Sequence, residues 1–112
     1  MKQLAVLPFV ALVSACLPHP PPAPAPYRAV GVNAGWTLLI DERDVTFIEG
    51  QTVVRQPRPT SIVGVAGEIY QTPRINVNIV HSQCSDGRSS IAYPNRVQVT
   101  VDARRYEGCG GL

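Results

Sequence analysis

The chain has little charge, and its charges are balanced. Only 16% of its 112 residues are Asp, Glu, Lys or Arg, and ten basic residues stand against eight acidic ones. A nucleic-acid-binding domain carries a clear excess of basic residues, so we expect no nucleic-acid partner. After Lys2 every basic residue is an arginine. We interpret these arginines as scattered solvated charges, with an anion-binding surface as the alternative.

Long apolar runs are also missing. The run from Leu4 to Val13 is far shorter than the roughly 20 residues that a membrane-spanning helix requires. It follows Lys2 directly, and a short positive start before an apolar run of this length is typical of a secretory signal. The start of the chain is therefore predicted to direct export.

This signal ends in LVSAC at residues 12–16, which resembles the bacterial lipobox, where small residues precede an invariant cysteine. The resemblance implies a signal peptide at residues 1–15, cleavage before Cys16 and lipid on Cys16, whose several acyl chains form an effectively permanent membrane anchor. Leu17 is not the aspartate that favours inner-membrane retention. The resemblance therefore implies an outer-membrane protein facing the periplasm, if the source is Gram-negative. The alternative is a buried thiol after an ordinary signal peptide.

Cysteine is scarce, with three residues in the chain. If Cys16 carries lipid, Cys84 and Cys109 remain as an even pair in an oxidising compartment, and we expect them to form a disulfide. A closed loop of about 25 residues would stabilise the domain by roughly 3.5 kcal/mol. Alternation along the strands places both thiols on polar faces, so we expect the bridge on the outer surface of neighbouring strands.

Proline is concentrated near the start of the mature chain. Residues 17–26 read LPHPPPAPAP, which favours an extended polyproline conformation. At about 3.1 Å per residue it forms a semi-rigid spacer of some 30 Å. We therefore predict a lipidated cysteine and tether over residues 16–34 and a domain over residues 35–112.

The remaining sequence has a period of two and lacks any helical segment of ten or more residues. We predict an all-β fold, a small antiparallel barrel or sandwich of about six short strands. The predicted strands are 35–41 and 45–49 as a hairpin, 53–54, a weak or bulged segment at 61–70, 74–84, and 96–101 with 104–109 as a hairpin around Asp102 and Ala103. The predicted core residues are Ile75, Val77, Ile79, Val97, Val99 and Val101. Trp36 is interpreted as core, with an exposed sugar-stacking side chain as the alternative.

Three segments of the chain resemble a family of uncharacterised bacterial envelope lipoproteins that carries a CSDGMSD…YP motif before a terminal hairpin. They are CSDG at residues 84–87, AYP at 92–94 and YEGC at 106–109. The chain departs from the family at 88–91, which read RSSI, and at 33–36, where NAGW replaces a TEPFW motif. The likeness covers roughly residues 33–111 and implies a fold more than an activity.

Residues that could support catalysis or metal binding are few. Ser85-Asp86-Gly87 is interpreted as a turn, because Asp accepts backbone hydrogen bonds and Gly adopts positive φ. Ser89 or Ser90 with His81 and Asp86 could be drawn as a triad, but no Gly-x-Ser-x-Gly motif supports it. His81 and Cys84 offer two ligands where structural zinc needs four. We expect no enzymatic activity, no metal and no cofactor.

We therefore expect a non-enzymatic envelope lipoprotein whose β-domain binds an envelope protein or peptidoglycan. The alternative is a lipid-anchored inhibitor of a cell-wall hydrolase such as lysozyme. The candidate contact surface combines the polar strand face with the 85–95 loop, since Arg and Tyr are favoured at interface hot spots. Its predicted members are Asn76, Asn78, Arg88, Ser89, Ser90, Tyr93 and Arg96. A merely solvated sheet face is the alternative interpretation of the same residues.

Overall fold

The computed structural model describes Pro18, Pro21 and residues 24–112, and in this part of the chain every regular element is a β-strand. The strands are β1 (Tyr27–Gly31), β2 (Trp36–Ile40), β3 (Asp44–Glu49), β4 (Thr52–Pro57), β5 (Ile62–Val63), β6 (Gly67–Gln71), β7 (Ile75–Val80), β8 (Cys84–Ser85), β9 (Ala92–Tyr93), β10 (Asn95–Val101) and β11 (Arg104–Gly110). Among these residues there is accordingly no helix long and apolar enough to cross a membrane. The signal peptide and Cys16 lie outside the described residues.

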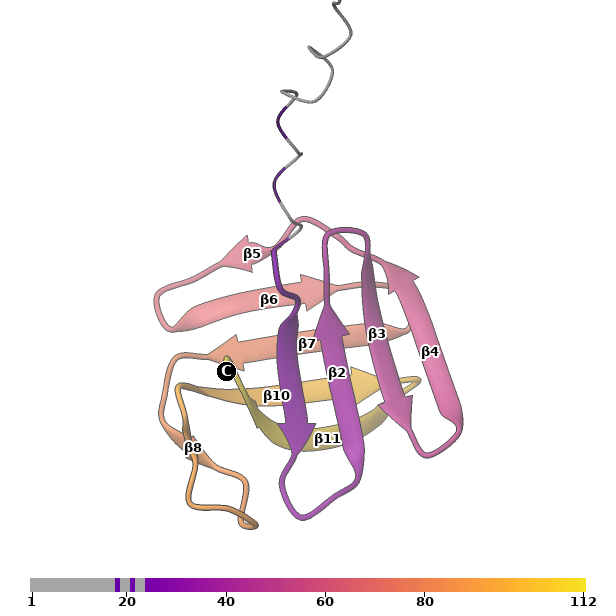
Figure 1. Ribbon diagram of the computed structural model, residues 1–112. Helices are drawn as coiled ribbons and strands as arrows, with labels where there is room; N and C mark the ends of the chain where they lie inside the picture. The colour runs from indigo at the N-terminus through magenta and orange to yellow at the C-terminus, as the bar shows by residue number, and fades with distance from the viewer. Residues whose placement is uncertain (1–17, 19–20, 22–23) are drawn as a thin grey trace, which may run out of the picture.

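Nine of the strands form one antiparallel sheet in the order β4-β3-β2-β1-β11-β10-β7-β6-β5, while β8 and β9 pair only with each other. Figure 1 shows β1 to β4 crossing in front of β6, β7 and β10, so the sheet curls over on itself into a half-barrel. The predicted all-β class, a small antiparallel barrel or sandwich, is confirmed. The described residues form eleven strands rather than about six, because β1 was not predicted, the segment 61–70 contains both β5 and β6, and β8 and β9 are strands of two residues.

The domain begins earlier than predicted. β1 starts at Tyr27 and pairs on one side with β2 and on the other with β11, so it is an interior strand of the sheet. The predicted boundary between residues 34 and 35 is therefore wrong. The proline-rich segment ends where β1 begins, because proline lacks the N–H that an interior strand must donate.

The core lies inside the curl of the sheet. All six core residues predicted on β7 and β10 are at most 5% exposed, and they face apolar side chains from β1 to β4. Trp36 is 3% exposed and packs against Phe47, with ring centroids 5.7 Å apart. The sugar-stacking alternative for Trp36 is therefore wrong.

The predicted strand from Arg74 to Cys84 is too long. β7 ends at Val80, where the Ser82 amide donates back to the Val80 carbonyl and the His81 amide donates to Ala66, both at 2.8 Å. The chain then leaves the sheet. Cys84 consequently lies in β8 and does not share a strand face with the asparagines of β7.

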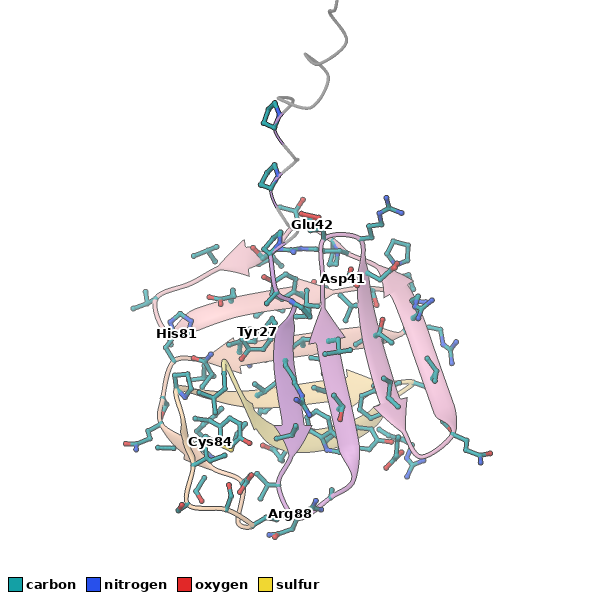
Figure 2. The ribbon with its side chains drawn as sticks, in the orientation of Figure 1. Tyr27, Asp41, Glu42, His81, Cys84 and Arg88 are labelled. Carbon is teal, nitrogen blue, oxygen red and sulfur yellow. A yellow bond between two sulfur atoms is a disulfide. The ribbon has the colours of Figure 1, made fainter. Side chains whose placement is uncertain are left out.

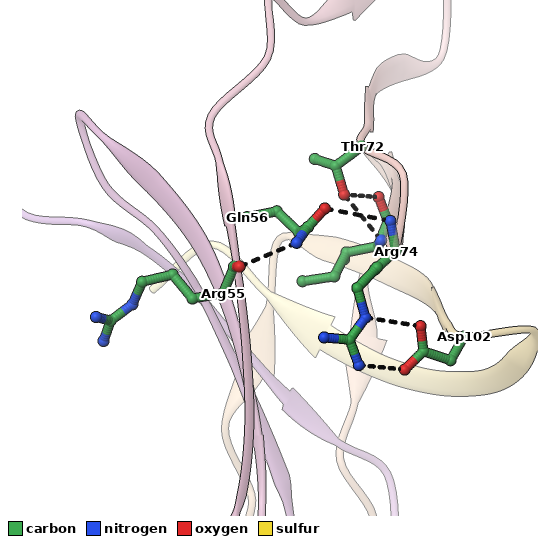
Figure 3. A network of polar contacts seen from close by, with 6 residues as sticks. Arg55, Gln56, Thr72, Arg74 and Asp102 are labelled. Carbon is green, nitrogen blue, oxygen red and sulfur yellow. Dashed lines mark hydrogen bonds and ion pairs between the residues drawn. The ribbon is translucent and has the colours of Figure 1, made fainter.

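The open edge of the half-barrel is tied by polar contacts that the sequence pattern did not indicate (Figure 3). Gln56 on the edge strand β4 accepts a hydrogen bond from the Arg74 amide at 3.3 Å. The Arg74 guanidinium forms a two-pronged ion pair with Asp102, whose pKa it lowers by hydrogen bonding. Asp102 and Ala103 have φ values of 47° and 73°, the left-handed conformation of a tight hairpin turn, which confirms the predicted turn between β10 and β11.

Candidate contact surface

Residues 81–94, which include β8 and β9, form a flap outside the main sheet. The predicted disulfide between Cys84 and Cys109 is present, with the two Cα atoms 5.5 Å apart. Cys109 on β11 pairs with Arg96 on β10 and so lies on the outer face of the sheet. This agrees with the face predicted from the alternation of residues along the strand. Cys109 is nevertheless fully buried, because the flap covers it. The bridge therefore fastens the flap to β11 rather than joining neighbouring strands of the sheet.

Asp86 organises the tip of the flap. Its buried carboxylate accepts hydrogen bonds from the amides of Arg88 at 2.8 Å and Ser89 at 3.0 Å, and from the hydroxyl of Tyr93 at 3.2 Å. These bonds, those from the backbone first, lower the pKa of Asp86. Gly87 has a φ of 78°, so the turn predicted at residues 85–87 is present. A small rigid loop results, and Figure 2 shows Arg88 at the end of the molecule away from the tether.

Acid should open this loop. Because the folded-state pKa of Asp86 is lowered, its carboxylate stabilises the flap fully above the unfolded value of about 3.9, and this stabilisation is lost as the pH falls further towards the folded value. We expect hydrogen exchange at the Arg88 and Ser89 amides to lose protection over that acidic range. Asp86→Asn should lower this protection already at neutral pH. Asp41 makes the same kind of turn between β2 and β3, so Asp41→Asn is the matched control and should leave the flap amides protected.

Shallow hollows surround the base of the flap. One, of about 340 Å³, lies between the flap and the sheet and is lined by Val32, Gln83, Cys84, Ser85, Arg96, Glu107 and Gly108. A second, of about 360 Å³, shares residues 83–85 and extends over Ser89 to Ala92. A third, of about 270 Å³, shares Arg96 and Glu107 and reaches Gln98. Together they form a groove of mixed polar and apolar lining, which we call the flap groove.

Charged and amide groups lie on the sheet side of the flap groove, beside apolar surface. Arg96 and Glu107 border two of its three hollows. Gln98 donates a hydrogen bond to the Glu107 carboxylate at 3.3 Å. The groove thus offers a cation, an anion and amides within a small area. Such a surface can form hydrogen bonds and ion pairs with a polar partner.

The structure divides the predicted contact residues into groups. Arg96, Ser89 and Ser90 border the flap groove, and Arg88 is exposed on the flap. Tyr93 is half-buried with its hydroxyl bonded to Asp86, so it holds the flap together.

Asn76 and Asn78 lie farther along the outer face of the sheet. Asn78 borders a different hollow, beside β5 and β6. Gln83 and Glu107 were missed as groove residues. The alternation of β11 could have found Glu107, which faces the same side as Gln98, whereas no sequence signal marks Gln83.

The serine, histidine and aspartate of the hypothetical triad are not arranged as a relay. His81 Nε2 lies 3.2 Å from a carboxylate oxygen of Glu68, while Ser89 Oγ donates directly to Asp86. Cys84 is held in the disulfide and cannot act as a thiolate ligand. Within residues 24–112 and the two described prolines, no three His, Cys, Asp or Glu side chains converge on a possible metal position.

Neither a family model, nor a curated protein, nor a solved structure matches this chain.

Proposed function

We propose that the chain is a lipid-anchored envelope protein whose β-domain binds another envelope component through the flap groove. The anchor is supported by the sequence: Lys2, the apolar run that follows it, and the small residues immediately before Cys16. The same pattern, with Leu17 after the cysteine, favours the outer membrane and the periplasm. A binding role fits a rigid β scaffold that presents a well-ordered loop.

Replacing Cys16 by serine tests the anchor. The hydroxyl cannot form the thioether to lipid, so Cys16→Ser should lack acyl chains and leave the membrane fraction. Mass spectrometry and membrane fractionation of the two proteins make the measurement. Equal mass additions and equal membrane retention in wild type and variant would contradict the anchor.

The observation that carries the binding proposal is the double fixation of the flap. The disulfide fastens its base, and the hydrogen bonds to Asp86 order its tip. A loop that is ordered before binding loses little conformational entropy on association, which favours affinity. The exposed Arg88 and Arg96 are the cations that this flap and groove present to a polar partner such as a polypeptide or peptidoglycan.

Arg88→Ala combined with Arg96→Ala should weaken capture of the partner about tenfold or more, because exposed arginines at an interface commonly contribute 1 kcal/mol or more each. Wild type and variant, each with its lipid, are incubated with envelope extract and then cross-linked. In separate experiments each is incubated with purified peptidoglycan and with lysozyme. Tyr93 is left intact because it holds Asp86.

Arg43→Ala combined with Arg55→Ala is the matched control, since these exposed arginines lie on the β3 and β4 side of the sheet. It should capture like wild type. Equal capture by both double variants would contradict the flap groove as the binding surface. Selective retention of lysozyme, together with loss of its lytic activity in the presence of the domain, would favour the inhibitor.

A further inference from the structure

The turn between β5 and β6 is an exposed apolar protrusion. We call Ile62, Val63, Gly64, Val65 and Ala66 the apolar hairpin. Ile62 is 52% exposed, Val63 is 77% exposed, and Val65 has no burial at all. Residues 59–67 contain no charged side chain. Isolated surface valines are ordinary, but several large apolar side chains on one uncharged turn form a patch that water solvates poorly.

The apolar hairpin is apolar on both faces and at its tip. Ile62 pairs with Ile69, which pairs with Asn78, so Ile62 lies on the outer face of the sheet. Val63 pairs with Glu68 and lies on the opposite face. Val65 projects from the turn, which the Gly64 amide closes by donating to the Gly67 carbonyl at 2.8 Å. A protein partner packs against one face of a strand, whereas the hydrocarbon of a bilayer surrounds every face.

A second copy of the chain fits this edge less well than lipid does. β5 is only two residues long and is preceded by Pro57 and Pro59, so it offers few backbone groups for edge-to-edge pairing. Proline cannot donate to a partner strand. The apolar side chains, rather than the backbone, are therefore the groups that need a partner.

The strand that begins the apolar hairpin, β5, lies at the end of the domain that the tether enters, and the turn after β5 extends to the side (Figure 1). Figure 1 shows residues 24–26 reaching β1 at the end of the molecule where β5 lies. A spacer of some 30 Å keeps the start of β1 within about that distance of any bilayer that holds the anchor, so the effective concentration of the hairpin at the surface is high and weak insertion suffices.

We propose that the apolar hairpin inserts into the surface of the bilayer that holds the lipid on Cys16, an inference that rests on the anchor proposed above. The domain then contacts the membrane at two points, the lipidated cysteine and the hairpin. The flap lies at the other end of the domain from the tether (Figure 2), so the flap groove stays in water when the hairpin is inserted.

Val65→Cys labelled with an environment-sensitive fluorophore tests the insertion in the mature lipidated protein. The variant is reconstituted on vesicles of phosphatidylethanolamine and phosphatidylglycerol. We expect the emission to shift to shorter wavelength and to be quenched by lipids that carry spin labels in their acyl chains. Val53→Cys is the matched control, because Val53 is 55% exposed on the opposite edge strand and should keep its aqueous spectrum.

The outcomes separate the two proposals. Lipidated protein that floats with vesicles while Val65→Cys keeps an aqueous spectrum overturns the insertion and leaves the anchor standing. Mature protein without acyl chains overturns the anchor and this inference with it. A short-wavelength spectrum before vesicles are added, together with a cross-linked Val65→Cys dimer, assigns the hairpin to a second copy and overturns insertion.

Discussion

Replacing Cys84 and Cys109 together by alanine is expected to lower the free energy of unfolding by about 3.5 kcal/mol, because the bridge closes a loop of roughly 25 residues and restricts the unfolded chain. The sequence separation of the two cysteines is 25. Alanine is preferred to serine at position 109, where the side chain is fully buried and a hydroxyl would lack water. Denaturant titrations of wild type and double variant make the measurement.

A reducing agent provides the control for this prediction. It should destabilise wild type by the same amount and leave the double alanine variant unchanged. If the flap alone is released, its amides lose protection from hydrogen exchange while β7 and β10 keep theirs. Equal midpoints for oxidised wild type and double variant would show that the bridge contributes nothing to the fold.

Trp36→Ala is expected to lower the free energy of unfolding by about 3–5 kcal/mol, the usual range for removing a large aromatic side chain from a core. Trp36 is 3% exposed, and its ring lies 6.1 Å from that of Tyr106. Two glycines make room for it: a Cβ on Gly31 or on Gly108 would lie 2.6 Å from an atom of the indole. Neighbours without side chains cannot fill the space that Trp36 leaves, so the cavity should persist.

Circular dichroism is the suitable probe for this variant, because Trp36 is the single tryptophan in the chain and its loss removes the fluorescence signal. Trp36→Phe should lose less stability, since part of the volume remains. Val53→Ala, at an exposed position, should change the free energy of unfolding by no more than about 0.5 kcal/mol. If Trp36→Ala lowers the free energy of unfolding as little as Val53→Ala does, the indole has no central role in the core.

The regular strands could be predicted because their buried residues are large and alternate with polar ones. In β7 and β10 every fully buried position is Ile or Val, and these positions alternate with more exposed ones. Only one face of each strand meets the core, so the period of two in the sequence reports directly on the structure. The hairpin of β2 and β3 was predicted on the same grounds.

β1 could not be predicted from the same signal. Its inward positions are Tyr27, Ala29 and Gly31, of which only Ala29 and Gly31 are fully buried. Trp36 from β2 occupies the space that a side chain at position 31 would need. The apolar bulk that should mark β1 is therefore supplied by its neighbour. A pattern of large apolar residues cannot reveal a strand whose burial depends on being small.

The candidate site was predicted in part. The turn at Asp86 and Gly87 follows from local chemistry, which needs no knowledge of the fold. The flap groove does not, because Gln83 and Glu107 meet only when the chain leaves the sheet after Val80 and folds back over β11. The position at which β7 ends depends on the hydrogen bond from the His81 amide to the carbonyl of Ala66, which is distant along the chain.

The interior position of β1 determines how the domain responds to mechanical force. Tension arriving through the tether acts first on Tyr27, and β1 is hydrogen-bonded to β2 on one side and to β11 on the other. A pull along the strand loads both rows of hydrogen bonds at once in shear, whereas an edge strand would peel away one bond at a time. β11 is in turn fastened to the flap through Cys109, so the flap and the first strand after the tether are both attached to β11. If the domain is tethered to a membrane on one side and to a bound partner on the other, the load passes through β1 and β11, two interior strands that are each paired on both sides.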